Sequence, residues 1–311
     1  MAKGARVATV LVNFGQPDDT VSAVEAVQSG EYLDNTVVVV DNDPEAEVGS
    51  PLNLRLDATV SYLPLGRNAG YAAGNNAGIR LAKDLHDVEF AWVLNPDTIP
   101  EPRALAGLVE AAEQCPDAAL IGSRLVDGTG RTIYNGASVD PVSGQTRHLD
   151  IGRPLRGLSQ REPFDTDYAN GASMLVRLAL VPIVGLIPED YFLYFEETDY
   201  AMRCQSLGFR VVVAPESIVR HDRRSWGQLP TSTYVYYMVR NREIFSQRWG
   251  FDEGGAHRAA TDFFVSGWRE KIAGFRPELV PVFDGLVARA IADGEGGVTG
   301  FSEVPTAMRL A

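Results

Sequence analysis

The sequence lacks the features that mark several other classes of protein. It has only two cysteines, Cys115 and Cys204, whose wide separation excludes a disulfide framework and a cysteine-based metal motif. Its longest uncharged apolar stretch, Leu178 to Pro188, is too short to cross a bilayer. The N-terminus shows no signal-peptide pattern, so we expect a cytoplasmic, globular protein with both cysteines in its core.

Positive charge is also scarce. Against 41 Asp and Glu residues the chain has 28 Lys and Arg residues, which gives a net charge of −13. An acidic surface repels the phosphates of nucleic acids and of anionic lipids, so we expect no nucleic-acid partner and no electrostatic attraction to a membrane. Composition does not indicate the oligomeric state.

What the sequence does contain is an alternation of β-branched runs with helical patterns over its first 125 residues. We predict strands at residues 6–13, 36–41, 60–63, 89–94 and 118–125 and helices at 20–27, 75–85 and 102–114. Alternation of this kind is typical of βαβ units and predicts a Rossmann-like, mostly parallel sheet flanked by helices. The fold class is therefore α/β.

The rest of the chain follows other patterns. Residues 127–167 are rich in Gly, Thr, Ser, Pro and Arg, which predicts hairpins and loops over a site. Further strands are predicted at 171–176 and 210–214, a helix from Glu196, and helical structure from Ser232 onward. We expect one domain over residues 1–245, with halves at 1–125 and 126–245, and a C-terminal helical subdomain over 246–311.

A metal-capable acid follows the apolar run of residues 90–94. Asp97, in the segment Asn95-Pro-Asp-Thr, would leave the sheet at its carboxyl edge, where ligands gather in open α/β sheets. His221 could complete a cation site if the fold brings it to Asp97. The alternatives are an ordinary turn at Asn95-Pro and a structural histidine.

Glycines recur every four residues at Gly70, Gly74 and Gly78, a spacing that differs from the Gly-x-Gly-x-x-Gly dinucleotide fingerprint. A glycine loop that leads into a helix offers backbone N–H groups and the positive helix end to a diphosphate, and Arg67 would add charge. The alternative is a turn followed by close packing of the helix on the sheet.

Two further acidic segments could take part in a site. One follows a predicted strand, and the other begins a predicted helix. Asp41 ends the strand at residues 36–41 and could accept the imide N–H of uracil or thymine; alternatively it caps a turn. If Glu196 begins a helix, Glu197 points inward as a general base, whereas Asp199 pairs with Arg203 on the outer face. The alternative is that these acids only stabilise the first helical turn.

Together these motifs resemble the inverting glycosyltransferases of family 2, which have the GT-A fold, and in particular the rhamnosyl- and galactofuranosyltransferase branch. The resemblance covers about residues 6–245 and rests on the segments at 39–42, 68–76, 94–98 and 194–200. It implies that residues 1–125 form the nucleotide-binding half and residues 126–245 the acceptor and catalytic half.

The resemblance also implies residue roles. Asp97 matches the last acid of the family's metal-binding triplet, His221 the histidine that completes the site, and Glu197 the catalytic base, with Asp199 as the second candidate. Two departures are visible: Asn95 stands where many relatives have a further acid, and Glu197 stands where Asp is usual. The implied cofactor is Mg²⁺ or Mn²⁺.

The implied donor is a nucleoside-diphosphate sugar of the UDP or dTDP type, and the implied acceptor is a glycan or a lipid-linked saccharide. The residues expected at the donor are Asn13, Asp41, Arg67, Asn68, Gly70, Tyr71, Gly74, Asn75, Asn95 and Asp97. Those expected at the acceptor are Gly171, Ala172, Met174, Tyr194 and Trp226.

Two other functions remain open at this point. A nucleotide-sugar-binding relative with little or no activity is suggested by Asn95 and Glu197. A nicotinamide-dependent oxidoreductase is disfavoured, because no dinucleotide fingerprint follows the first predicted strand. The sequence also leaves open a peripheral contact of the C-terminal helices with the inner face of a membrane.

Overall fold

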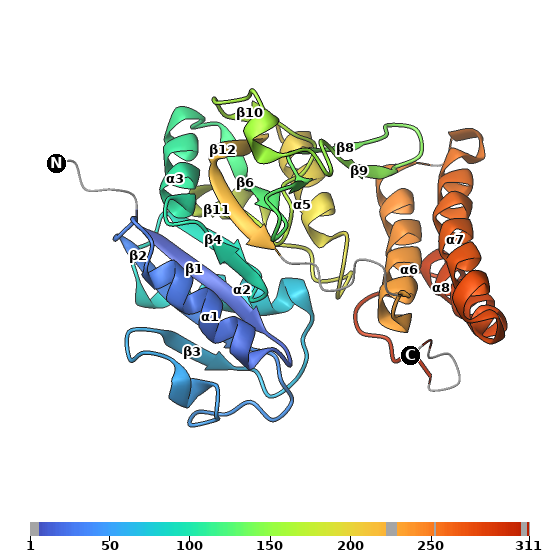
Figure 1. The fold of residues 1–311 in the computed structure, drawn as a ribbon, viewed down its shortest axis with the longest axis horizontal. Coiled ribbons are helices and arrows are strands. Elements are labelled where there is room, and N and C mark those ends of the chain that lie inside the picture. The colour runs from blue at the N-terminus through green and yellow to red at the C-terminus, as the bar shows by residue number, and fades with distance from the viewer. Residues whose placement is uncertain (1–5, 222–228, 252, 306–309, 311) are drawn as a thin grey trace. The chain divides into compact units, whose positions relative to one another are not determined.

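The computed structural model describes residues 6–221, 229–251, 253–305 and 310. Contacts divide the chain into two compact units (Figure 1). The α/β unit comprises residues 1–138, 148–188 and 196–222, and the helical unit comprises 139–147, 189–195 and 223–311. The expected boundary at residue 245 falls inside helix α6 (Ser232–Trp249), whose contacts with α8 (Val280–Glu295) place the whole helix in the helical unit.

A mixed, mostly parallel sheet forms the centre of the α/β unit, as the sequence predicts. Its strand order is β10-β12-β6-β11-β4-β1-β2-β3, with β5 paired to β12 and β7 to β6. The strands are β1 (Val7–Asn13), β2 (Asn35–Asp41), β3 (Ser61–Pro64), β4 (Phe90–Leu94), β5 (Thr98–Pro100), β6 (Ala118–Val126), β7 (Thr132–Tyr134), β10 (Phe164–Asp165), β11 (Ser173–Arg177) and β12 (Arg210–His221).

Helices cover the sheet. They are α1 (Pro17–Gln28), α2 (Tyr71–Leu85), α3 (Ala104–Gln114), α4 (Val181–Val184) and α5 (Glu196–Ser206). Helix α2 contacts β1 and β2, whereas α3 and α5 contact β6 and β12. All residues of β4 and β6 are buried. Strands covered in this way need apolar side chains on both faces, which explains the uninterrupted apolar run of β4.

Residues 127–167 contain short strands and turns and no α-helix, as expected for this fully described segment. A small hairpin pairs β8 (Ala137–Val139) with β9 (Thr146–His148).

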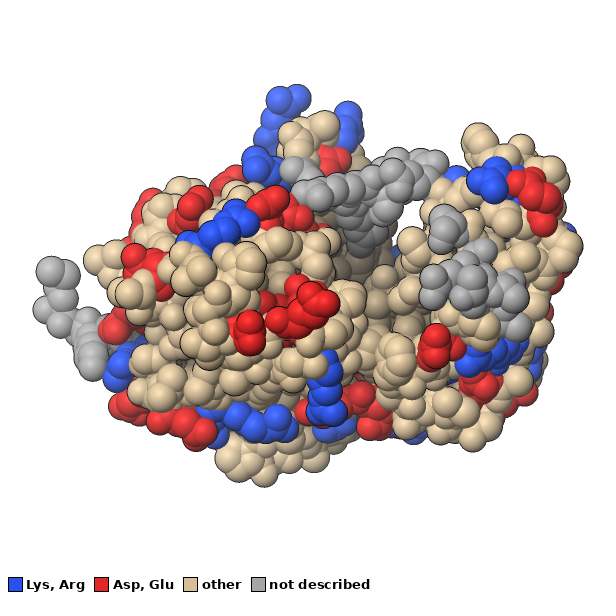
Figure 2. Space-filling view, turned by 90° about the horizontal axis from the view of Figure 1, so that it is seen from below, with Lys and Arg blue, Asp and Glu red and all other residues tan. Residues whose placement is uncertain are grey.

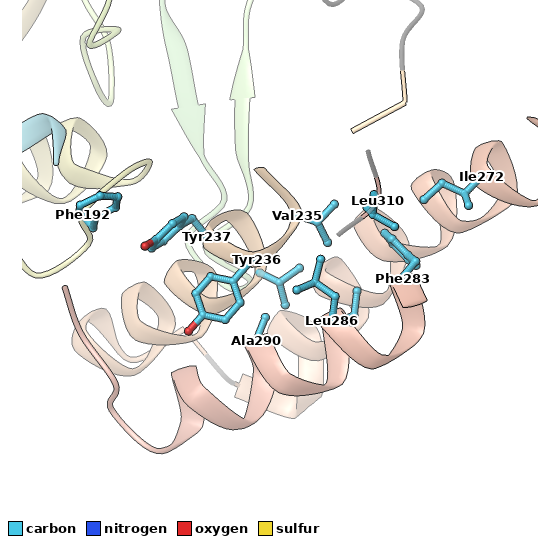
Figure 3. Packing of buried hydrophobic residues seen from close by; sticks show 11 residues of the cluster. Phe192, Val235, Tyr236, Tyr237, Ile272, Phe283, Leu286, Ala290 and Leu310 are labelled. Carbon is cyan, nitrogen blue, oxygen red and sulfur yellow. The ribbon is translucent and has the colours of Figure 1, made fainter. Parts of the chain in front are cut away.

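Among its described residues, the helical unit contains three long helices, α6, α7 (Ala256–Phe275) and α8. The Thr231 hydroxyl accepts a hydrogen bond from the Tyr234 N–H at 3.1 Å and caps α6, and Gly250, with φ of 74°, ends it. Figure 3 shows how apolar residues of these helices pack together with Phe192 and Leu310. The labelled residues are Phe192, Val235, Tyr236, Tyr237, Ile272, Phe283, Leu286, Ala290 and Leu310.

Charged side chains of both signs are interspersed on the molecular face shown in Figure 2. Several form exposed ion pairs, such as Arg269 with Asp284 at 2.8 Å and Arg258 with Glu295 at 2.5 Å. Exposed pairs of this kind contribute little to stability. Among the described residues, no helix has the length and apolar character needed to span a bilayer.

Candidate active site

Four strands bring the predicted site residues to one edge of the sheet. The parallel strands β1 and β2 place Asn13 opposite Asp41, and β4 places Leu94 opposite Leu11. Strand β11 runs antiparallel to β4, so its first residue, Ser173, lies opposite Leu94. The carboxyl ends of β1, β2 and β4 therefore lie at the same edge of the sheet as the first residue of β11. This is the edge at which α/β sheets bind ligands.

Asp97 and His221 lie together although they are 124 positions apart in the sequence. Strand β12 ends at His221, opposite Thr98 of β5, and this register brings the His221 Nε2 to 3.2 Å from the Asp97 Oδ2. The Asp97 side chain keeps 32% of its surface exposed and that of His221 keeps 13%. A carboxylate and an imidazole in this arrangement can both bind one divalent cation.

This pair does not form a complete metal site by itself. Among the described residues, no group of three or more His, Cys, Asp and Glu side chains is placed to hold an ion. The half-buried Asn95 supplies its backbone to the turn, with its carbonyl accepting the Thr98 hydroxyl at 2.6 Å. An ion bound by Asp97 and His221 therefore needs further oxygen ligands from a substrate.

Asp41 is held by protein groups on both carboxylate oxygens. Its Oδ1 accepts hydrogen bonds from Asn13 Nδ2 at 2.8 Å and from the Asp43 N–H at 3.2 Å. Its Oδ2 accepts the Tyr62 hydroxyl at 2.6 Å. Burial and this hydrogen bond raise the pKa of Tyr62 to about 12. The turn-capping alternative for Asp41 is thus realised, and any imide N–H would share an already occupied carboxylate.

The glycine segment differs from a phosphate loop over most of its length. Helix α2 begins at Tyr71, four residues before the predicted start, with Gly70 at its N-cap at φ of 87°. Gly74 lies inside this helix, where an added Cβ would come within 2.7 Å of Val12 Cγ1. Gly78 is similarly close to Val10. The packing alternative is therefore correct for Gly74 and Gly78, and only Gly70 stands at the helix end.

Other residues predicted at the donor surround this helix start. The Asn68 Oδ1 accepts the Gly70 N–H at 3.0 Å, and the Gly70 carbonyl accepts Asn42 Nδ2 at the same distance. Asn75 is buried and donates to the Tyr71 carbonyl at 2.9 Å. The Arg67 residue is exposed just before the helix. Arg67 and Gly70 thus stand at the positive end of α2, where an anion is favoured.

Tyr71 reaches the acceptor segment instead of the donor residues. Its hydroxyl donates to the Gly171 carbonyl at 2.6 Å. A Cβ added at Gly171 would lie 2.7 Å from that hydroxyl oxygen and 3.6 Å from Glu197 Cδ. Burial, followed by the charges of Glu197 and Glu196, raises the pKa of Tyr71 well above its ordinary value. Three elements, α2, the entry to β11 and α5, therefore converge at Gly171.

The two candidate bases have different environments. Glu197 remains partly exposed, and withdrawal from water raises the pKa of its carboxyl above 4.5, although backbone N–H groups of Glu197, Gly171 and Thr198 act in the opposite direction. Asp199 is fully buried, so its predicted position on the outer face is wrong. Helix α5 contacts β12 and β6, and both Asp199 and Cys204 are buried. A fully buried carboxylate cannot reach an acceptor hydroxyl.

The predicted acceptor residues are not all available to a ligand. Met174 is fully buried in β11, paired with Val93 and Gly122, so its assignment to the acceptor side is wrong. Ala172 is also buried, and its carbonyl accepts the Asn95 N–H at 3.0 Å. Tyr194 lies in the helical unit with its ring 5.5 Å from that of Tyr234. Trp226 lies outside the described residues.

Asn170 shapes the entry to β11 and was not among the residues predicted from the sequence. Its Oδ1 accepts the Ala172 N–H at 2.9 Å and its carbonyl accepts the Ser173 N–H at 3.1 Å. The only local signal was the Asn-Gly dipeptide, which is a common turn former. Asn170 therefore fixes the backbone that presents Gly171 to Tyr71.

Comparison with known proteins gives one family match over this region. The family model described as Glycosyl transferase family 2 matches residues 10–175. A low-salt glycan biosynthesis hexosyltransferase, Agl10 of Haloferax volcanii, is 24% identical over 76% of this chain and 74% of its own length. An N-acetylglucosaminyl-diphospho-decaprenol L-rhamnosyltransferase of Mycobacterium tuberculosis is 27% identical over 65% of this chain and 72% of its own.

Solved structures with a similar fold are GT-A glycosyltransferases. The crystal structure of GalNAc-T7 with UDP, GalNAc and Mn²⁺ has a TM-score of 0.60 at 15% identity, and the match covers 89% of this chain but 59% of that one. The mannosyltransferase PcManGT of Pyrobaculum calidifontis, in complex with GDP-Man and Mn²⁺, has a TM-score of 0.56 at 12% identity, over 94% and 88% of the two chains.

The contact between Tyr71 and Gly171 can be tested by adding one methyl group. We expect Gly171→Ala to lower the free energy of unfolding by about 1–3 kcal/mol, because the new Cβ overlaps the Tyr71 hydroxyl. Denaturant unfolding measures this loss, and a second change, Tyr71→Phe, should restore part of it. The control is Gly157→Ala, where the added Cβ has no neighbour within 4 Å. If Gly171→Ala and Gly157→Ala were equally stable, the contact between Gly171 and Tyr71 would be contradicted.

The raised pKa of Glu197 predicts a pH dependence of stability. Between 4.5 and the higher folded-state value, Glu197 is ionised in the unfolded chain but protonated in the folded one. Its contribution to stability is therefore present at low pH and is lost as the pH rises through that interval. We expect Glu197→Gln to be more stable than the wild type at neutral pH, with the difference vanishing below pH 4.5. Unfolding of the exposed-site control Glu162→Gln should show no such trend.

Proposed function

Because this chain belongs to glycosyl transferase family 2, it is a glycosyltransferase, and we propose that it transfers a sugar from a UDP- or dTDP-sugar with inversion. The acceptor is a hydroxyl of a glycan or a lipid-linked saccharide. The observation that carries this proposal is the pair of Asp97 and His221, 3.2 Å apart at the carboxyl edge of the sheet.

A divalent cation, Mg²⁺ or Mn²⁺, fits this pair. One carboxylate oxygen and one imidazole nitrogen come from separate strand ends, and the incomplete protein ligand set leaves positions for diphosphate oxygens. When bound there, the ion would neutralise charge on the departing nucleoside diphosphate. Two of the structurally similar proteins were solved with Mn²⁺ and UDP or GDP-Man, which supports this proposal.

The nucleotide would occupy the edge formed by β1, β2 and the start of α2. The N-terminus of α2 and the exposed Arg67 favour a negatively charged diphosphate. Asn13 and Tyr62 hold the Asp41 carboxylate in one orientation, and the one acceptor position that remains on its Oδ2 would take the imide N–H of the base. These residues position the donor before any bond breaks.

Glu197 is the base that we propose for the acceptor. It is the partly exposed acid beside Gly171, and its raised pKa suits removal of a proton from a hydroxyl as that oxygen attacks the anomeric carbon. Attack from the face opposite the diphosphate inverts the anomeric configuration. Asp199 is not a base in this scheme, because it is fully buried.

The acceptor class is proposed from the curated relatives. One is described as acting in glycan biosynthesis, and another as acting on a saccharide joined by a diphosphate to decaprenol. We therefore propose that this chain extends a saccharide carried on a lipid diphosphate. A short-chain N-acetylglucosaminyl-diphospho-lipid is the first acceptor to test.

Metal-dependent nucleotide binding tests the donor site. We expect UDP or dTDP at a hundredfold excess over its dissociation constant to stabilise the protein by about 2.7 kcal/mol in Mn²⁺ and less in EDTA, whereas NAD should give no shift. Asp97→Ala should abolish the difference between Mn²⁺ and EDTA, and the exposed-site control Asp84→Ala should keep it. Thermal unfolding measures all of these. An Asp97→Ala protein with the wild-type metal dependence would contradict the role of Asp97.

Loss of the proposed base tests the reaction. We expect Glu197→Gln to lower kcat by about 10²–10⁴-fold while metal-dependent nucleotide affinity stays unchanged. Product formation from dTDP-rhamnose, UDP-glucose or UDP-galactose is followed by mass spectrometry, and NMR of the product reports the anomeric configuration. Glu162→Gln is the matched control. Full activity of Glu197→Gln would reject the base, and nucleotide binding without turnover by the wild type would favour an inactive relative.

A further inference from the structure

The loop that leads into α5 has an unusual backbone. Phe192, Tyr194 and Phe195 all have positive φ, at 68°, 71° and 77°. Among the described residues, the only other non-glycine position with positive φ is Asp150. Bulky side chains rarely adopt this left-handed region, and such strain persists only where surrounding groups enforce it. Phe195 is followed directly by Glu196 and the proposed base.

One side chain of α6, Asn241, donates hydrogen bonds to three backbone carbonyls of this loop. Asn241 Nδ2 lies 3.1 Å from the Tyr191 oxygen, 2.7 Å from that of Leu193 and 2.9 Å from that of Tyr194. The Asn241 Oδ1 accepts a hydrogen bond from Arg240 Nε at 2.9 Å, which fixes the orientation of the amide. Asn241 is fully buried, so water does not compete for these bonds.

Arg240 also bonds to the same loop. Its guanidinium donates to the Tyr191 carbonyl at 2.6 Å and to the Gly300 carbonyl at 2.7 Å. The Gly300 N–H in turn donates to the Asp190 carbonyl at 2.5 Å. Arg240 is fully buried and stacks over the Tyr237 ring at 4.7 Å. The loop is thus bonded to α6 directly and through the segment at Gly300.

We propose that Arg240 and Asn241 are positioning residues for sugar transfer. They hold the loop at residues 191–195, with its three left-handed residues, in the conformation that sets where α5 begins, and thereby set the position of Glu197. This inference rests on the proposed role of Glu197 as the base. A shift of about 1 Å in a reacting group can lower a rate a hundredfold, so a relaxed loop would reduce kcat without affecting nucleotide binding.

The test is Asn241→Asp, which keeps the shape of the side chain but replaces the donor by an acceptor. We expect kcat per folded molecule to fall at least tenfold, with the dissociation constant for UDP or dTDP in Mn²⁺ within twofold of the wild type. Hydrogen exchange should show faster deuterium uptake in the peptide that spans residues 191–198. If this variant does not fold, Arg240→Lys is the second variant, because it keeps the charge but loses the planar guanidinium group. It should also lower kcat while the dissociation constant for UDP or dTDP stays unchanged.

Thr231→Ala serves as the matched control, because it removes the cap of the same helix without touching the loop. It should lower the melting temperature and leave kcat unchanged. A purely structural role would lower the melting temperature of Asn241→Asp but leave kcat per folded molecule at the wild-type value, and that result would overturn the proposal. If the wild type turns over none of the donors, the proposed function fails. Unchanged deuterium uptake at residues 191–198 would then separately overturn the positioning role.

Discussion

The reversed direction of β11 is the constraint on which the site depends. In a wholly parallel sheet the carboxyl edge receives only strand ends, but antiparallel pairing with β4 brings the start of β11 to the same edge. The hydrogen bond from the Asn95 N–H to the Ala172 carbonyl, at 3.0 Å, ties the turn after β4 to that strand. Strand β12 adds His221 through its antiparallel pairing with β5. Residues from distant parts of the sequence meet because the incoming strand β11 lies between the outgoing strands β4 and β6.

Burial distinguishes the acids at the start of α5, although all of them have favourable positions relative to the helix dipole. Glu196 and Asp199 are 1% and 0% exposed, whereas Glu197 is partly exposed. A buried carboxylate needs hydrogen bonds to offset its lost hydration, which ties it to the fold. A partly exposed carboxylate that also receives backbone N–H groups can exchange its proton with a ligand. The three neighbouring acids therefore differ in their environments because the fold buries two of them and leaves the third partly exposed.

The sheet and its helices were predictable because the pattern of apolar residues reflects burial. Strand β4, which is buried along its whole length, is an uninterrupted apolar run in the sequence. The meeting of Asp97 with His221 was predictable only from the family resemblance, since it depends on a strand register between distant segments. The environment of Asp199 was wrongly predicted, because helical spacing within one segment does not show which faces of the helix the rest of the fold buries. Asn241 left no local signal at all: its partners are backbone carbonyls, which every residue possesses.

The glycine spacing that suggested a phosphate loop has a different physical effect. Without side chains at Gly74 and Gly78, α2 approaches β1 so closely that a Cβ at Gly74 would overlap Val12. The same helix begins with Tyr71, whose hydroxyl bonds to the Gly171 carbonyl. Gly171 itself must lack a side chain, because a Cβ there would meet Tyr71. Close packing on one side of α2 therefore determines the geometry at its N-terminal end. There the residues that we propose for donor binding meet the segment that contacts Glu197.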